Sequence, residues 1–385
     1  MVELTVCEIN KCVGCMACKS VCKKDAIDIR DSLIALNAYI DEEKCINCGL
    51  CRNICQINGV VNHNKPIEWK QGWADEKYRT TSTSGGIAQA IMMSFLKEGK
   101  VYSCTFEDGK FIYRLVKDEE DVIHFIGSKY VKSNPYSVYK QALEDLKAGI
   151  KVLFIGLPCH VQALTMYAKE YRNNLYTIDL ICHGTPSEKL FLNYIKEEKI
   201  DTNKVDYFSF RQSLDCSQDE NMCAVSSNPF FDFWLKPFMD ALTFTEGCYY
   251  CKYACVDRVS DLTIGDSWGS KMDDRERAKG ISLLLINSLK GKQLIEMINV
   301  YLADVDIQVA KQINTQLVKP SEKHINRVIF EKNIAFGYKS TIRKCYIKDY
   351  KKACMYNSLL WRVYRKIRKR PQNKKMYELR YKETE

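Results

Sequence analysis

The chain has 385 residues, more than one average domain contains, so two or three domains are expected. Its nineteen cysteines have no charged and apolar leader before them, which favours a reducing cytoplasm over the disulfide framework of a secreted protein. The net charge of +10 is concentrated in residues 339–385, which carry +12 and leave −2 for the rest, so a nucleic-acid partner is not expected.

Two cysteine blocks near the N-terminus share the pattern CxxCxxCxxxC. Four thiolates at this spacing bind a cubane iron-sulfur cluster, and in two-cluster ferredoxins the fourth cysteine of each block ligates the other cluster. We therefore assign one 4Fe-4S cluster to Cys12, Cys15, Cys18 and Cys55, and a second one to Cys45, Cys48, Cys51 and Cys22.

Zinc and disulfides are the alternative explanations of the two blocks. Zinc sites take CxxC pairs separated by a longer arm, and a third cysteine three residues on would be surplus in a tetrahedral site. The four-cysteine pattern occurs twice and gives eight cysteines in all, which favours iron-sulfur clusters. Lys23 and Gln56 follow the fourth cysteines, where bacterial ferredoxins usually have proline.

A polar connector, residues 58–65, ends at Pro66 and marks the exit from the first domain. The second domain begins near Trp69. Its first predicted elements are a helix over 85–97 and a hairpin over 101–116 that turns at Asp108 and Gly109.

The hydroxyl-rich stretch TSTSGG, residues 81–86, opens the predicted helix over 85–97. A helix N-terminus presents unpaired N–H groups and a partial positive charge, so a phosphate could bind there. Ordinary N-capping by Ser or Thr is the alternative, and it needs no ligand.

Two apolar runs, 152–155 and 175–182, read as buried strands of an α/β sheet between helices predicted over 136–147 and 186–198. They end in GLPCH and CHGTPS. Active sites in such sheets collect at the carboxyl ends of strands. Further strands are expected over 205–211, 261–264 and 282–287, and a helix over 290–301.

Four later cysteines form a third candidate cluster site. Cys159 and Cys182 follow the two predicted strands, and Cys248 and Cys251 form a CxxC pair. If these segments converge, a third 4Fe-4S cluster fits there, with Cys255 as a substitute ligand or a spectator. The alternative is that they are small buried hydrophobic residues.

Other polar residues near these motifs have two explanations each. Asp266 and Trp268 could face a cofactor or fill a turn and a core, and His183 could give a proton or be satisfied by backbone. Lys129 could bind an anion or be an ordinary solvated lysine.

The basic tail, residues 338–385, contains LLWRVYRKIRKR at near-helical spacing. Such a helix could lie on an anionic membrane surface. It could equally pack Trp361 and Tyr364 on the body of the protein. Apolar stretches elsewhere are too short to span a bilayer.

The ordered motifs TSTSGG, FIGSKYVKS, GLPCH, DLICHGTPS, CYYCKYAC and DRVSDLTIGDSWG resemble the coenzyme F420 hydrogenase/dehydrogenase beta-subunit family over roughly residues 5 to 300. The resemblance implies FAD near Ser82, Thr83, Ser84, Gly85 and Gly86, with Ser128, Lys129 and Tyr130 in the same site. It also implies that Cys159, Cys182, Cys248 and Cys251 hold a flavin-proximal cluster. His160 stands where the family often has glutamine.

The expected architecture is α+β or α/β: a two-cluster ferredoxin-like domain (1–65), a mixed α/β flavin-binding domain (66–337) and a basic helical tail (338–385). The expected function is an iron-sulfur flavoprotein oxidoreductase. Electrons would pass from a donor such as ferredoxin through the clusters to FAD and a two-electron acceptor, either coenzyme F420-like or a small conjugated substrate, and family members are often linked to polysaccharide assembly. The alternative is an electron-transfer subunit serving a partner enzyme.

Overall fold

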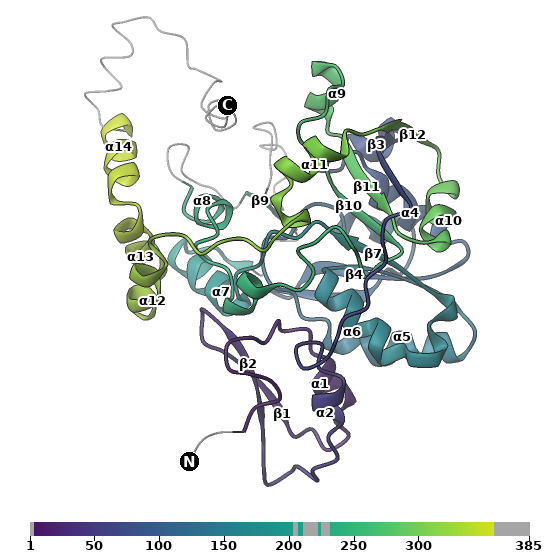
Figure 1. Ribbon diagram of the computed structural model, residues 1–385. Helices are drawn as coiled ribbons and strands as arrows, with labels where there is room; N and C mark the ends of the chain where they lie inside the picture. The colour runs from purple at the N-terminus through teal and green to yellow at the C-terminus, as the bar shows by residue number, and fades with distance from the viewer. Residues whose placement is uncertain (1–3, 203–206, 211–221, 225–231, 358–385) are drawn as a thin grey trace, which may run out of the picture.

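The computed structural model describes residues 4–202, 207–210, 222–224 and 232–357, and Figure 1 shows a small N-terminal domain beneath a larger sheet domain. The basic segment 359–370, with Trp361 and Tyr364, lies outside these residues, so its contact with a membrane or with the body of the protein stays a prediction. Within the described ranges, no helix has both the length and the apolar character that crossing a bilayer requires.

The N-terminal domain repeats one local conformation, as its doubled motif predicts. It contains a hairpin of β1 (Ile27–Asp31) and β2 (Leu36–Ile40), and the short helices α1 (Ala17–Val21) and α2 (Leu50–Asn53). Gly14 and Met16 in the first block, like Asn47 and Gly49 in the second, have left-handed φ angles between 53° and 72°. Both cysteine loops therefore follow the same path into a short helix.

An eight-stranded mixed sheet forms the second domain, in the order β12-β3-β11-β10-β7-β6-β4-β5. Its four central strands, β10, β7, β6 and β4, are parallel, and the strands on either side are antiparallel. The bounds are β3 Glu68–Ala74, β4 Gly99–Glu107, β5 Lys110–Leu115, β6 Lys151–Gly156, β7 Leu175–Leu180, β10 Leu262–Asp266, β11 Ser282–Ile286 and β12 Val300–Asp304.

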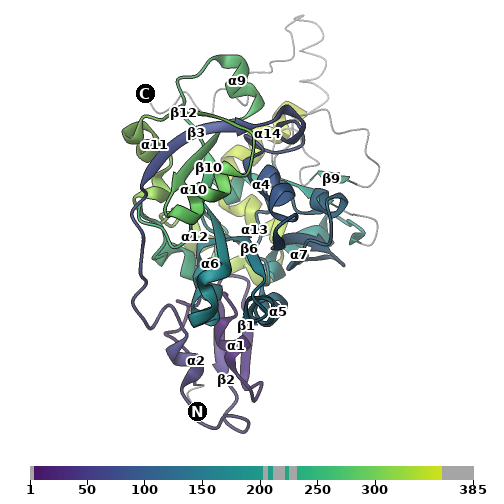
Figure 2. The same cartoon turned by 90° about the vertical axis from the view of Figure 1, so that its right-hand side faces the viewer.

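Helices cover this sheet. They are α3 Glu76–Arg79, α4 Ile87–Phe95, α5 Tyr136–Lys147, α6 Pro158–Ala168, α7 Glu188–Glu197, α8 Leu235–Met239, α9 Asp274–Lys279, α10 Leu289–Glu296, α11 Ile307–Ile313, α12 Arg327–Asn333, α13 Tyr338–Cys345 and α14 Ile347–Asn357. The last three, α12, α13 and α14, lie at the left of Figure 1. Two short strands, β8 (Tyr207–Ser209) and β9 (Met222–Ala224), pair separately. Helix α1 packs against α5 and α6, on the side of the sheet domain that faces the N-terminal domain (Figure 2).

Most elements predicted from the sequence are present, and the mixed α/β class is confirmed. The β4–β5 hairpin turns at Asp108 and Gly109, whose φ angles of 50° and 75° suit a type I′ turn. The helix predicted over 290–301 is wrong in its second half, because α10 ends at Glu296 and β12 pairs with β3. Strand β3 was not expected.

The parallel arrangement decides where the chemistry-bearing loops lie. Because β6, β7 and β10 run in the same direction, their carboxyl ends meet at one edge of the sheet. The loop GLPCH follows β6, CHGTPS follows β7, and Trp268 follows β10. Val152, Leu153 and Phe154 of β6 are fully buried, so the strand that leads to this edge lies in the core.

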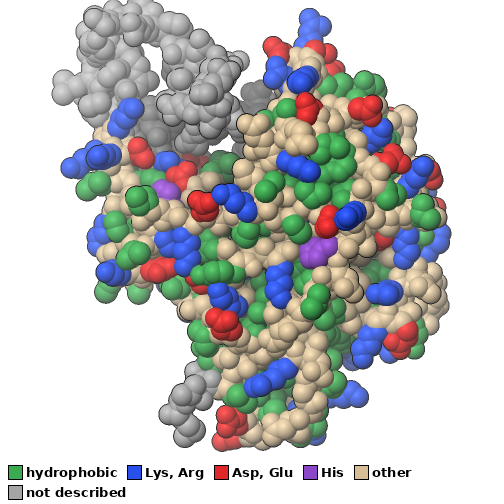
Figure 3. Space-filling model, in the orientation of Figure 1, with side chains coloured by type: hydrophobic (Ala, Val, Ile, Leu, Met, Phe, Trp, Pro, Cys, Tyr) green, Lys and Arg blue, Asp and Glu red, His purple; other side chains and the backbone are tan. Residues whose placement is uncertain are grey.

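On the face of the molecule seen in Figure 3, Lys and Arg side chains are interspersed with Asp and Glu. This mixture agrees with the near-neutral charge of the chain outside its C-terminal segment.

Candidate functional site

The first cysteine set lines a small cavity inside the N-terminal domain. Cys12, Cys15, Cys18 and Cys55 are all buried there, and Cys55 reaches the other three from the second block. Cys7 lines the same cavity. Its place could not be foreseen from the motif, because Cys7 stands outside the repeated spacing.

The second cysteine set lies closer to the surface. Cys48 is exposed, and Cys22, Cys45 and Cys51 are partly buried. Burial raises the pKa of the Cys51 thiol, and the thiolates of Cys22 and Cys45 raise it further, so the fourth cysteine of the first block lies near the second block.

Backbone amides already donate hydrogen bonds to sulfur atoms of both sets. The N–H of Gly14 lies 3.4 Å from Cys12 Sγ, and the N–H of Asn47 lies 3.4 Å from Cys45 Sγ. Hydrogen bonds to cysteine sulfur are among the factors that set the reduction potential of iron-sulfur clusters. The matching geometry follows from the repeated left-handed turns at these positions.

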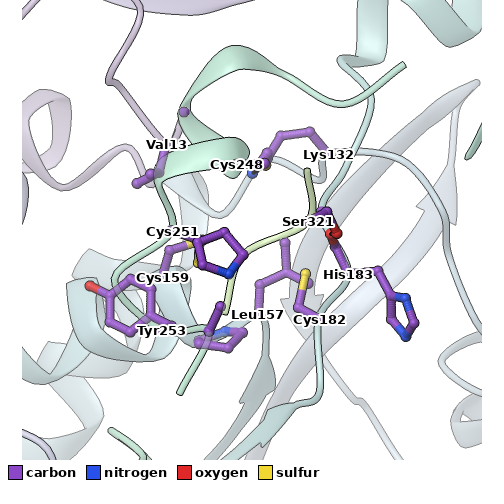
Figure 4. A pocket seen from close by; sticks show the side chains of 15 residues that line it. Val13, Lys132, Leu157, Cys159, Cys182, His183, Cys248, Cys251, Tyr253 and Ser321 are labelled. Atoms are coloured by element: carbon purple, nitrogen blue, oxygen red, sulfur yellow. Dashed lines mark hydrogen bonds between the residues drawn. The ribbon is translucent and has the colours of Figure 1, made fainter. Parts of the chain in front are cut away.

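The third cysteine set converges at the carboxyl edge of the sheet. Cys159 lies in the first turn of α6, Cys182 follows β7, and Cys248 and Cys251 lie in and just after a 3-10 helix, Glu246–Tyr250. All four line one cavity. Figure 4 shows their side chains around a common space, with Val13 of the N-terminal domain beside them.

A buried lysine neutralises charge at this third site. Lys132 Nζ lies 3.9 Å from Cys248 Sγ, and the Lys132 side chain also lines the cavity. Burial raises the pKa values of Cys159, Cys182 and Cys251 to about 12. At Cys248 burial acts in the same direction, but Lys132 and hydrogen bonds from Thr245 and Thr185 outweigh it and lower the pKa.

Cys255 belongs to a different environment from the other two cysteines of its motif. Its Sγ atom lies 3.6 Å from His63 Nδ1 and 3.1 Å from the carbonyl oxygen of Asp257. The cavity that Cys248 and Cys251 line does not include it. This placement favours the spectator interpretation of Cys255.

The described part of the chain holds no group of three or more His, Cys, Asp or Glu side chains arranged around a single metal ion. In a cubane cluster the thiolates bind four different iron atoms, so their sulfur atoms stand farther apart than the ligands of one zinc ion. Cysteine sets that suit a cubane cluster are therefore not expected to form a group around one metal ion.

A larger cavity of about 270 Å³ lies beside the third cysteine set. Its volume is close to the lower end of the roughly 300–1,000 Å³ typical of small-molecule sites. It is lined by seven residues that the family resemblance assigns to FAD and by three that the sequence left open: Ser82, Thr83, Ser84, Gly86, Ser128, Lys129, Tyr130, His183, Asp266 and Trp268. Gly85 instead packs against Gly72 and donates its N–H to Ser282 Oγ.

The hydroxyl-rich turn before α4 does not act as an ordinary N-cap. Gly86 occupies the capping position with a φ of 75°, and no side chain caps the helix. A Cβ atom at Gly86 would lie 2.7 Å from the backbone of Tyr78 and Arg79, so glycine is needed there. The side chains of Ser82 and Thr83 instead contact Gln89 and Ser128 and remain at the cavity wall.

Lys129 lines the cavity with a half-buried amine whose hydrogen bonds go to the protein backbone. Its Nζ donates to the carbonyl oxygens of Phe125 and Ile126, each at 2.7 Å, and of Gly127 at 3.3 Å. Burial lowers the pKa of Lys129 to about 8. Its charge therefore changes close to physiological pH.

Two histidines near the site have different surroundings. His183 points away from the four cysteines in Figure 4, and its ring meets Trp268 edge-on with centroids 5.5 Å apart. His160 is fully buried, and its Nδ1 lies 3.0 Å from the hydroxyl of Tyr113. Tyr113 also lines the larger cavity, so His160 supports that wall from behind.

The two cavities share a wall. Leu157, Cys182, His183 and Gly184 line both of them. A ligand in the larger cavity would therefore lie next to the third cysteine set. The segment 128–133 contributes to both sides, because Lys129 and Ser133 line the larger cavity and Lys132 lines the smaller one.

Several residues at the site were missed or left without a role at the level of sequence. Lys132 belongs to the motif FIGSKYVKS and Arg258 to the motif DRVSDLTIGDSWG, but neither residue carries a local signature of its contacts. Gln56 departs from the proline that is usual in ferredoxins, and that departure is the signal that the sequence offers.

Comparisons with known proteins agree with the two-part organisation. Residues 149–307 match the family described as coenzyme F420 hydrogenase/dehydrogenase, C terminus of the beta subunit, and residues 11–58 match the 4Fe-4S dicluster domain. No curated protein matches the chain. Among solved structures, one similar chain belongs to the xenon-derivatised F420-reducing NiFe hydrogenase complex from Methanosarcina barkeri. The two sequences are 17% identical, and the structural alignment covers 73% of this chain and 97% of the hydrogenase chain with a TM-score of 0.46. The chain therefore contains, at residues 149–307, the C-terminal domain of the coenzyme F420 hydrogenase/dehydrogenase beta-subunit family, and, at residues 11–58, a 4Fe-4S dicluster domain.

Proposed function

We propose that the chain is an iron-sulfur flavoprotein oxidoreductase with three 4Fe-4S clusters and one FAD. Electrons enter from a small redox protein such as ferredoxin, pass through the two N-terminal clusters and the third cluster, and reach FAD and a two-electron acceptor. The acceptor is a deazaflavin such as coenzyme F420, which the description of the matching family names, or another small conjugated compound.

The donor chemistry fits iron-sulfur clusters at all three sites. Each site offers four cysteine sulfurs, and at the third site Lys132 supplies a buried positive charge beside them. Thiolates bind iron-sulfur clusters in this number, and nearby cations offset the negative charge that thiolates and cluster carry together.

The larger cavity supports a flavin site. Hydroxyl groups of Ser82, Thr83 and Ser84 and the cation of Lys129 line it, and such groups suit the phosphates of a dinucleotide. A bound flavin exchanges electrons singly with clusters and in pairs with hydride acceptors. The protein side chains bind and orient the cofactor and exclude water around it.

The shared wall carries the proposal. Cys182, a ligand of the proposed third cluster, also lines the cavity proposed for FAD, so no further carrier is needed between the two. At the opposite end of the path, Cys48 is exposed and its neighbour Ile46 is 62% exposed. An accessible cluster loop with an apolar tip suits the docking of a redox protein.

Anaerobic purification tests the proposal by composition. We expect about twelve iron atoms and one FAD per chain, from three cubanes and one flavin. Iron analysis and the absorption spectrum of the released flavin measure both numbers. About eight iron atoms and no flavin would overturn the proposal.

The second candidate function is an electron-transfer subunit whose substrate chemistry takes place on a partner. The match of residues 149–307 to a beta-subunit family favours it. Steady-state assays of the isolated chain with a reduced donor and coenzyme F420 separate the two functions. Turnover without a partner supports the enzyme, and turnover that appears only on adding a partner protein supports the second function.

Lys129 predicts a pH dependence of flavin binding. Below pH 8 the protonated amine attracts phosphate, and above its pKa of about 8 this attraction is lost. We expect the dissociation constant of FAD to rise about tenfold as pH increases through this range, because the three N–H groups already bind backbone carbonyl oxygens and the amine acts on phosphate through its charge alone. Fluorescence titration of flavin-free protein measures it. The Lys129→Met variant should bind weakly at every pH, and an unchanged pH profile in this variant would contradict the assignment.

A further inference from the structure

Gln56 directly follows Cys55, a cysteine of the first set, and its side chain crosses to the sheet domain. It is 1% exposed. Its Nε2 donates to the carbonyl oxygen of Cys159 at 2.9 Å, and its Oε1 accepts a hydrogen bond from the hydroxyl of Tyr253. Cys159 and Tyr253 both line the third cysteine cavity. One amide thus joins two cysteine sites that belong to different domains.

The residue type matters because this is the position where bacterial ferredoxins usually have proline. Proline offers no side-chain donor or acceptor. Glutamine offers both, and both are used across the domain boundary. At Gln56 this departure from the ferredoxin pattern therefore provides a contact between the two domains.

Further contacts of the same boundary surround Gln56. Lys252 Nζ donates to the carbonyl oxygens of Gln56, Ile57 and Gly59 at 2.9–3.1 Å. Tyr139 donates its hydroxyl hydrogen to the carbonyl oxygen of Cys15 at 2.9 Å. The backbone of residue 247 approaches so closely that a Cβ atom there would lie 2.6 Å from the carbonyl oxygen of Cys12, and that residue is glycine.

These contacts fall on one cysteine set of the N-terminal domain. They reach Cys12 and Cys15 of the first set, and Gln56, which follows Cys55 of that set. Val13 lines both the first and the third cysteine cavities. The second set instead includes the exposed Cys48. The first set is therefore the neighbour of the third site.

We propose that Gln56 is a positioning residue that holds the first cluster against the third cluster for electron transfer, with Tyr253 as its partner. This inference rests on the proposed function, because it requires clusters at both sites. Each transfer moves one electron from the reduced first cluster to the oxidised third cluster, with no bond formed or broken. The electron comes from the external one-electron donor.

The Gln56→Leu variant tests the proposal in the full chain loaded with its cofactors. The substitution removes both hydrogen bonds, which favour the docked arrangement by about tenfold. After mixing with a limiting amount of dithionite, we expect reduction of the third cluster to slow by about that factor while iron content stays unchanged. Electron paramagnetic resonance should also show weaker magnetic coupling between the reduced first and third clusters.

Two further variants keep the test decisive. Tyr253→Phe removes one hydroxyl and retains the ring, so it should slow the transfer less than Gln56→Leu and still reduce the coupling. Gln71→Leu is the matched control, because buried Gln71 uses both ends of its amide within the sheet domain, with Asp304 and Ser267. It should leave rate and coupling at the wild-type values.

Wild-type rates and coupling in fully loaded Gln56→Leu and Tyr253→Phe would overturn the proposal, as would an equal loss in Gln71→Leu. Failure of the proposed function gives a different result, because it appears as about eight iron atoms in the wild-type protein before any variant is compared.

Discussion

Replacing Cys159 by serine is expected to lower the iron content from about twelve to about eight atoms per chain, because one of three cubanes loses a thiolate ligand. Cys159 is buried in the first turn of α6, where no water can easily replace the missing sulfur. The two N-terminal clusters should keep their spectra, since their eight cysteines are untouched. Iron analysis and low-temperature electron paramagnetic resonance measure the loss.

Cys255→Ser provides the matched control for this experiment. Cys255 stands four residues after Cys251 in the same motif, but its sulfur contacts His63 and the carbonyl oxygen of Asp257. Its removal should leave about twelve iron atoms in place. Equal iron loss in Cys255→Ser, or full iron content in Cys159→Ser, would contradict the assignment of the third site.

The second large effect is expected at Arg258, which connects three segments around the third site. Its guanidinium donates to Asp179 at 3.1 Å, to the carbonyl oxygen of Leu180 at 2.9 Å and to that of Tyr253 at 2.7 Å. Its backbone also pairs with Asn64 of the domain connector. Arg258 therefore fixes the cysteine loop to the end of β7, two residues before Cys182.

Arg258→Leu should lower the free energy of unfolding by about 3–5 kcal/mol, because it leaves one member of a buried ion pair without its partner. Asp179 has no exposed surface, and burial already raises its pKa against the opposing effect of Arg258. Without the arginine this pKa rises further. The folded state then binds a proton that the unfolded state releases, so the stability of the variant falls as pH rises between the two pKa values.

Urea unfolding of the wild type and the variant at several pH values measures this effect. Asp304→Asn is the control, since Asp304 pairs with Lys70 at 2.8 Å but its side chain is 93% exposed. Such surface pairs contribute about 0–1 kcal/mol. An Arg258→Leu protein that unfolds at the same urea concentration as wild type would refute the role given to this residue.

Local pattern predicted the centre of the sheet but not its antiparallel side. Strand β6 contains a continuous apolar run that is buried on both faces, which is a strong signal, and β7 is mostly buried as well. Strand β3, with the sequence EWKQGWA, lacks such a run, and its partners β11 and β12 come more than 200 residues later. Pairing over that distance decides its conformation, and β12 likewise becomes a strand by pairing with β3.

The candidate site likewise contains residues that local sequence patterns predict and residues whose roles depend on distant contacts. The cysteines and TSTSGG could be found by spacing and composition, because cluster ligands and phosphate-binding turns have local signatures. The role of Gln56 depends on Cys159, which is 103 residues away, and that of Lys132 on Cys248, which is 116 residues away. Such contacts exist only after the two domains dock and the parallel strands bring their ends together.

The rate at which the flavin is reduced through the clusters tests the central claim most directly. Wild type with its three clusters and FAD, and Cys159→Ser with FAD and its two remaining clusters, are each mixed anaerobically with reduced ferredoxin, and flavin bleaching is followed by stopped-flow absorption. The electron path predicts rapid bleaching in the wild type and a loss of at least about a hundredfold in the variant, the scale on which misplaced reaction partners slow a transfer. Equal bleaching rates in the two proteins would contradict the path through the third cysteine site.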